Sequence, residues 1–155
     1  MTTKSDEAYA SFMSGFSCSQ AVLGSFAEGL GMDTTTAYKI SCGFGAGVSR
    51  SGHICGAVSG AIMIIGLKYG KVAPKDNVAR DKTYALSQEF IREFTRKNGS
   101  ISCTDLLGYN LNNPDEYAQA RDKKLFVTKC PALVRDAVAI LESLVNRETD
   151  RQESR

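Results

Sequence analysis

Tryptophan is absent from this 155-residue chain, and aromatic residues make up only 8% of it. Proteins that bind single-stranded nucleic acid stack bases on aromatic side chains, so a base-stacking surface is not expected. The formal net charge is only +2, with 19 basic and 17 acidic side chains interspersed along the chain. Because this excess is so small, we expect neither nucleic acid nor an anionic membrane surface as a partner.

Long hydrophobic runs are also missing. The longest uncharged segment, Ser51 to Leu67, begins as a polar loop and becomes apolar only from Ile54. A membrane span needs about 20 apolar residues, so no membrane insertion is expected. Residues 1–7 lack the apolar stretch of a secretory signal. We therefore expect a cytoplasmic protein, in a compartment where structural disulfides are rare.

The five cysteines include no C-x-x-C pair, and there is only one histidine. These absences exclude a thioredoxin-type motif, a zinc ribbon, c-type haem attachment and a helical H-E-x-x-H site. The cysteines are also far apart in the sequence. Any site that they share must therefore be assembled by the tertiary structure.

Strand signals are scarce, whereas helix signals occur throughout. No segment keeps an apolar–polar alternation between hairpin turns. Ser17 and Gln20 form a capping box, and Asp33 can cap a further helix. The predicted helices cover residues 5–13, 17–29, 34–42, 54–69 and 74–97, a short segment after 102, a segment from 114, and 131–145.

The predicted fold is all-α. The segment Ile54–Tyr69 is apolar nearly all round, so we expect it at the centre of an irregular helical bundle. Residues 1–145 form one predicted domain, and the charged residues 146–155 a frayed tail. Gly56 and Gly60 give the central helix a small-residue face, which suits close approach of another backbone within the chain or across a homodimer.

Four of the five cysteines stand where a helix should begin. Cys18 and Cys103 follow capping serines, and Cys55 follows a glycine-rich loop. Cys130 precedes Pro131, the residue type favoured at the first helical position. Unpaired N–H groups and the positive end of the helix dipole favour the thiolate, the form that attacks disulfides and binds metals.

The loop 43–52 contains four glycines, yet it is no nucleotide-binding motif. It lacks the G-x-x-x-x-G-K-[ST] pattern and follows a helix rather than a strand. We expect it to bring backbone N–H groups close to Cys55. His53 could pair with the thiolate, ligate a metal or simply be a loop residue, and Arg50 could support a thiolate or an anion or be an ordinary exposed side chain. The candidate cofactor-contacting residues are Gly45, Gly47, His53 and Gly56.

The segment Cys55-Gly56-Ala57-Val58-Ser59-Gly60 lies between Cys18 in FSCSQAVL and Cys130 in CPALV, with Cys103 also downstream. This arrangement resembles the family of redox-active proteins named for a C…CGAxxG…C…C pattern, which are small bacterial and archaeal proteins. The resemblance implies a redox role, with transport or electron-transfer proteins as neighbours. The four cysteines of the family correspond to Cys18, Cys55, Cys103 and Cys130, whereas Cys42 has no place in the pattern.

Three hypotheses follow. The first is thiol–disulfide exchange or electron relay, in which Cys55 attacks and Cys18, Cys103 or Cys130 resolves. The second is an iron–sulfur cluster or another thiophilic metal, with the same four cysteines as ligands. The third is a dimerising interaction module whose cysteines are inert. Under the first hypothesis the partner is another redox or electron-transfer protein.

Overall fold

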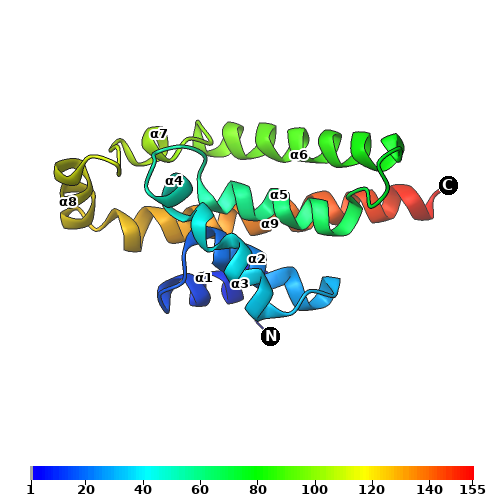
Figure 1. Cartoon of the computed structure of the whole chain (residues 1–155), viewed down its shortest axis with the longest axis horizontal. Coiled ribbons are helices and arrows are strands. Elements are labelled where there is room, and N and C mark those ends of the chain that lie inside the picture. The colour runs from blue at the N-terminus through cyan, green and yellow to red at the C-terminus, as the bar shows by residue number, and fades with distance from the viewer. Residues whose placement is uncertain (1) are drawn as a thin grey trace.

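The computed structural model describes residues 2–155, and helices dominate this part of the chain (Figure 1). The only β-type pairing in these residues is an isolated antiparallel bridge between Ile54 and Ser102. The all-α prediction is therefore confirmed. In chain order the helices are α1 (Lys4–Met13), α2 (Cys18–Ala27), η1 (Glu28–Leu30), α3 (Thr34–Ser41), η2 (Cys42–Phe44), α4 (Gly45–Ser49), α5 (Gly56–Tyr69), α6 (Asn77–Asn98), α7 (Cys103–Leu107), α8 (Pro114–Asp122) and α9 (Leu125–Glu153).

Capping side chains set most of the helix starts. The predicted box at α2 is present: Ser17 Oγ accepts from the Gln20 N–H, and the Gln20 side chain accepts from the Ser17 N–H. At the start of α3, the Asp33 side chain accepts from the Thr36 N–H. Each cap satisfies a backbone donor that the helix itself leaves unpaired. Helix α6 begins at Asn77, later than the predicted start at Pro74, because the Asp76 side chain provides its N-cap.

Helix α5 lies at the centre of the bundle, as its apolar sequence predicts. It packs against α2 on one side and against α6 and α9 on others (Figure 1). A Cβ added at Gly60 would lie 2.9 Å from the Ser19 carbonyl oxygen on α2, and one at Gly56 would lie 3.0 Å from the Ser19 nitrogen. The small-residue face thus serves a helix contact within the chain. It is covered by α2 and leaves the dimer hypothesis without its proposed surface.

Helix α9 departs from the prediction at both ends. It begins at Leu125, so Cys130 lies in its second turn and Pro131 inside the helix. The prediction that Cys130 opens a helix is wrong. Lys124 adopts a left-handed conformation (φ 61°) that separates α8 from α9, and Leu125 and Phe126 pack against the core. This packing outweighs the local preference of proline for the first turn.

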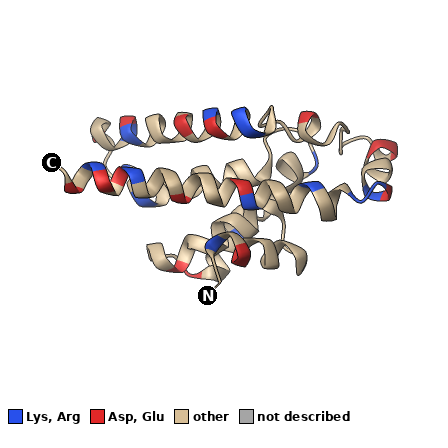
Figure 2. Cartoon of the chain, turned by 180° about the vertical axis from the view of Figure 1, so that it is seen from behind, with Lys and Arg blue, Asp and Glu red and all other residues tan. Residues whose placement is uncertain are grey.

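Residues 146–153, expected to fray, continue α9 as regular helix. Arg147 Nη2 lies 2.8 Å from Glu93 Oε1 on α6, and Lys82 Nζ lies 2.7 Å from Glu148 Oε1. Figure 2 shows basic and acidic residues interspersed along α6 and the C-terminal part of α9. No helix in residues 2–155 combines the length and the hydrophobicity that crossing a membrane requires.

Candidate functional site

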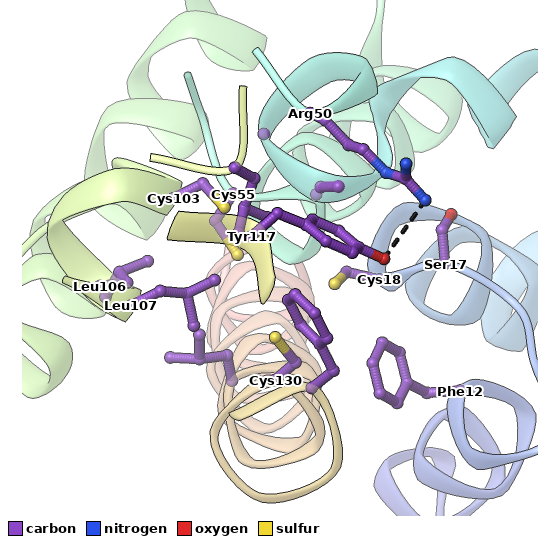
Figure 3. Close-up of a pocket in the computed structure, with 16 residues that line it drawn as sticks. Phe12, Ser17, Cys18, Arg50, Cys55, Cys103, Leu106, Leu107, Tyr117 and Cys130 are labelled. Carbon is purple, nitrogen blue, oxygen red and sulfur yellow. Dashed lines mark hydrogen bonds between the residues drawn. The ribbon is translucent and has the colours of Figure 1, made fainter. Parts of the chain in front are cut away.

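Cysteines from four separate segments line one cavity of about 180 Å³. Cys18, Cys55, Cys103 and Cys130 are each only 4–8% exposed, and all of them are free thiols. Figure 3 shows their sulfur atoms gathered around this cavity, in which the rest of the lining is largely apolar. The four cysteines that the sequence set apart therefore converge. Cys42 is exposed and lies outside the cavity.

The isolated bridge brings Cys55 and Cys103 together. The Cys55 N–H donates to the Ile101 carbonyl (2.8 Å), and the Cys103 N–H donates to the His53 carbonyl (2.7 Å). Because side chains alternate between the two faces of a bridge, Cys55 and Cys103 leave it on the same side. Ser102 then caps α7 directly behind this contact. The bridge thereby closes the 47 residues between Cys55 and Cys103 into a loop whose two ends meet at the site.

Glycines allow the segments that carry Cys18 and Cys103 to pack closely against their neighbours around the cavity. A Cβ at Gly47 would lie 2.6 Å from the Cys103 Cβ, and one at Gly56 would lie 3.1 Å from the Cys18 Cβ. Neither position has room for a side chain. Gly45 is also buried, where a Cβ would lie 2.5 Å from the Ser17 Cβ. These three glycines, predicted as cofactor contacts, act here as close-packing positions, and of them Gly47 and Gly56 line the cavity.

The glycine-rich segment forms an unusual left-handed turn. Five successive residues, 46–50, have positive φ values of 54–69°. Such a conformation costs about 1–2 kcal/mol for each residue other than glycine. Hydrogen bonds hold the turn in place: the His53 N–H donates to the Gly47 carbonyl (2.9 Å), and Ser49 Oγ donates to the Gly43 carbonyl (2.8 Å). The turn presents Ala46, Gly47 and Arg50 to the cavity.

Burial and neighbouring sulfur atoms raise the pKa values of Cys18, Cys55 and Cys103. The Cys130 side chain, together with burial, holds the pKa of Cys18 well above its ordinary value. Burial, followed by the neighbouring sulfurs, raises the pKa values of Cys55 and Cys103 to about 12. The N–H groups of Ala57 and Val58 act on Cys55 in the opposite direction but more weakly. The expectation that helix starts make Cys18, Cys55 and Cys103 thiolates is therefore wrong, because neighbouring sulfur atoms and desolvation outweigh the helix dipole.

At the mouth of the cavity, Arg50 and Tyr117 form a pair. Arg50 Nη2 donates to the Tyr117 hydroxyl oxygen (3.3 Å), and the guanidinium carbon lies 4.5 Å from the ring centroid (Figure 3). The Tyr117 ring in turn packs on Phe126, with centroids 5.3 Å apart. Sequence reasoning missed Tyr117. A tyrosine in a charged helix carries no signal until the fold brings α8 beside the glycine-rich turn.

Two predicted site features do not appear at the cavity. The side chain of His53 is exposed and is not part of the lining, although its backbone supports both the turn and Cys103. In residues 2–155, no three histidine, cysteine or acidic side chains adopt the arrangement of a metal-ion site.

Comparison with known proteins agrees with the cysteine pattern. Residues 16–144 match the family model described as "Putative redox-active protein (C_GCAxxG_C_C)". An uncharacterized protein of Archaeoglobus fulgidus is 30% identical over 140 residues, which cover 85% of this chain and 87% of the archaeal one. No solved structure matches the chain. In the family name, glycine stands before cysteine (GCAxxG), whereas in this chain Cys55 stands before Gly56. A cysteine in place of Gly56 would bring its Cβ too close to the backbone of Ser19.

Proposed function

Because the chain belongs to the C_GCAxxG_C_C family, described as redox-active, we propose that Cys18 and Cys130 form a reversible dithiol–disulfide pair. Two findings support this assignment: both cysteines line the same cavity, and Cys130 is the side chain that most raises the pKa of Cys18. A disulfide requires two sulfur atoms that can come into bonding distance, and these two cysteines face one cavity. Cys55 and Cys103 share the cavity and make its surroundings rich in sulfur.

The proposed reaction is two-electron thiol–disulfide exchange with a disulfide of a partner. One protein thiol loses its proton and attacks a sulfur of that disulfide, which releases the other sulfur as a thiol and leaves a mixed disulfide. The second protein thiol then attacks the mixed disulfide and releases the remaining half of the partner. In total, the protein dithiol becomes a disulfide, and the partner disulfide becomes two thiols.

This assignment changes the roles predicted from the sequence. The sequence predicts Cys55 as the attacking thiolate and Cys18, Cys103 or Cys130 as the residue that resolves the mixed disulfide. The influence of Cys130 on the pKa of Cys18 favours these two cysteines as the exchanging pair, with Cys55 and Cys103 as neighbours in the cavity.

Thiol counting and peptide mapping test the proposal. The protein is reduced without oxygen, oxidised mildly with diamide, alkylated, digested and analysed by mass spectrometry. We expect two of the five thiols to be lost and a peptide pair to be linked through Cys18 and Cys130. Cys42→Ser should keep this link, and Cys130→Ser should lose it. Full retention of all thiols, or a link through other cysteines, would contradict the proposal.

A thiolate-bound metal centre is the second candidate. Backbone N–H groups of Ala57 and Val58 act on the Cys55 sulfur, and that of Ala46 acts on the Cys18 sulfur. Donors of this kind stabilise anionic sulfur ligands, and soft thiolates suit iron–sulfur clusters, zinc or copper(I).

Anaerobic purification followed by elemental analysis and a visible spectrum tests this candidate. Stoichiometric metal that is retained in Cys42→Ser and lost in Cys55→Ser would support it. Colourless protein without metal would contradict it.

A further inference from the structure

Arg50 provides the positive charge at the wall of the cysteine cavity. The other lining residues are cysteines, Ser17, glycines, Ala46, aliphatic side chains and aromatic side chains, and none is a carboxylate. Within residues 2–155, Arg50 forms no salt bridge, and its guanidinium is held by the Tyr117 ring and hydroxyl. Its side chain is exposed, so an incoming anion can reach it.

The backbone holds this arginine in a defined place. Arg50 ends the left-handed turn 46–50 with φ 69°. The turn is anchored from both sides, since Gly47 packs against Cys103 and its carbonyl accepts the His53 N–H. Strained backbone of this kind persists only where the surroundings enforce it, and it is concentrated at functional sites. The geometry therefore directs one guanidinium at the entrance to four thiols.

The burial of the four thiols limits the size of the disulfide that can reach them. At 4–8% exposure, they are poorly placed for a disulfide on the surface of a folded protein. A small disulfide can enter an apolar cavity of about 180 Å³ at least in part. A carboxylate on such a molecule would meet the Arg50 guanidinium, whose planar fork suits that group.

We propose that Arg50 selects small carboxylate-bearing disulfides as substrates of the cysteine cavity. This inference rests on the proposed dithiol chemistry of Cys18 and Cys130. The substrate disulfide is reduced to two thiols as the protein dithiol is oxidised. Arg50 transfers no electron or proton, because it binds the carboxylate and thereby places the disulfide beside the sulfur atoms. Arg50 is thus a specificity-determining residue.

Two probe disulfides test this role on the full-length reduced protein in a Cys42→Ser background. Dithiobis(nitrobenzoate) carries two carboxylates, whereas dithiodipyridine is neutral, and the product that each releases is followed by its absorbance. The measured quantity is the ratio of the anionic rate to the neutral rate. We expect Arg50→Gln to lower this ratio roughly tenfold, since charge-assisted hydrogen bonds exceed neutral ones in strength. Arg50→Lys should recover part of it, and added salt should lower it in the parent protein.

Arg92→Gln is the matched control, because Arg92 is exposed on α6 and lies outside the cavity lining, and its loss changes the net charge equally. Its ratio should equal that of the parent. If Arg50→Gln and Arg92→Gln give the same ratio, the selectivity proposal is overturned while the dithiol chemistry stands. If neither probe oxidises Cys18 and Cys130, the proposed function and this inference both fail.

Discussion

At the scale of single residues, the thiols of the cavity are governed by a competition between local and tertiary effects. The helix start at Cys55 supplies N–H groups that favour the thiolate. Enclosure removes water and places other sulfur atoms nearby, which favours the neutral thiol. The effect of enclosure is larger than that of the N–H groups, so the pKa of Cys55 rises to about 12. The reduced protein therefore keeps these protons until a reacting disulfide or a metal replaces them.

This competition predicts a loss of stability in alkali. The unfolded chain releases each thiol proton near the ordinary pKa of 9.0, whereas folded Cys55 and Cys103 hold theirs to about 12. Between these values the unfolded state binds fewer protons, so the free energy of unfolding falls as pH rises, by about 1.4 kcal/mol per pH unit for each thiol. Urea denaturation of reduced protein from about pH 8 to about pH 10 measures this slope. Cys55→Ser should have a shallower slope, and an equal slope would contradict the pKa assignment.

At the scale of elements, the contact between α2 and α5 builds the site. Gly56 and Gly60 let α2 lie against α5 with no side chain between them. This close packing places Cys18, the first residue of α2, beside Cys55, the N-cap of α5. The bridge from Ile54 to Ser102 adds Cys103, and α9 supplies Cys130 from within a helix.

Two glycines of α5 should respond oppositely to alanine. Gly60→Ala places a methyl group 2.9 Å from the Ser19 carbonyl oxygen, so we expect a loss of about 1–3 kcal/mol in the free energy of unfolding. Gly66→Ala meets no atom within 4 Å and removes backbone entropy from the unfolded chain, so we expect a gain of about 0.5–1 kcal/mol. Urea denaturation of the reduced proteins checks both signs. A neutral Gly60→Ala would show that α2 can move away without cost.

At the scale of the whole molecule, the cavity joins segments from both ends of the chain. Cys18 lies near the N-terminus and Cys130 on the last helix, which packs along α1 and α6. Ion pairs such as Lys82–Glu148 and Arg147–Glu93 tie the C-terminal half of α9 to α6. A bond between Cys18 and Cys130 would therefore close most of the chain into one loop.

Oxidation should consequently stabilise the protein. In the chain-entropy description, a cross-link that closes a loop of roughly 100 residues contributes up to about 4–5 kcal/mol. We expect the urea midpoint of the oxidised protein to exceed that of the reduced protein. Cys130→Ser should show no such difference, and Cys42→Ser should behave as the parent. An oxidised protein that unfolds at lower urea would mean that the cavity must distort to form the bond.

The local part of this architecture could be predicted from the sequence. Ser17 and Asp33 mark helix starts because a cap hydrogen bond joins residues two or three positions apart. The central position of α5 follows from its apolar composition, since a helix without a polar face must be buried. The pattern also separated Cys42 from the other cysteines, which the structure bears out in their burial.

The remaining features depend on contacts between distant residues. Pro131 indicates a helix start locally, yet packing of Leu125 and Phe126 begins α9 earlier. The pKa values of Cys18, Cys55 and Cys103 rise rather than fall because segments that are distant in the sequence enclose these thiols and exclude water. The pairing of Arg50 with Tyr117 arises only when α8 meets the glycine-rich turn. The sequence by itself thus determined most of the helices and set four cysteines apart from Cys42, because capping, periodicity and motif spacing can be read from the chain alone. Only the tertiary structure decided that four sulfur atoms share one cavity, since their distances result from the packing of the whole chain.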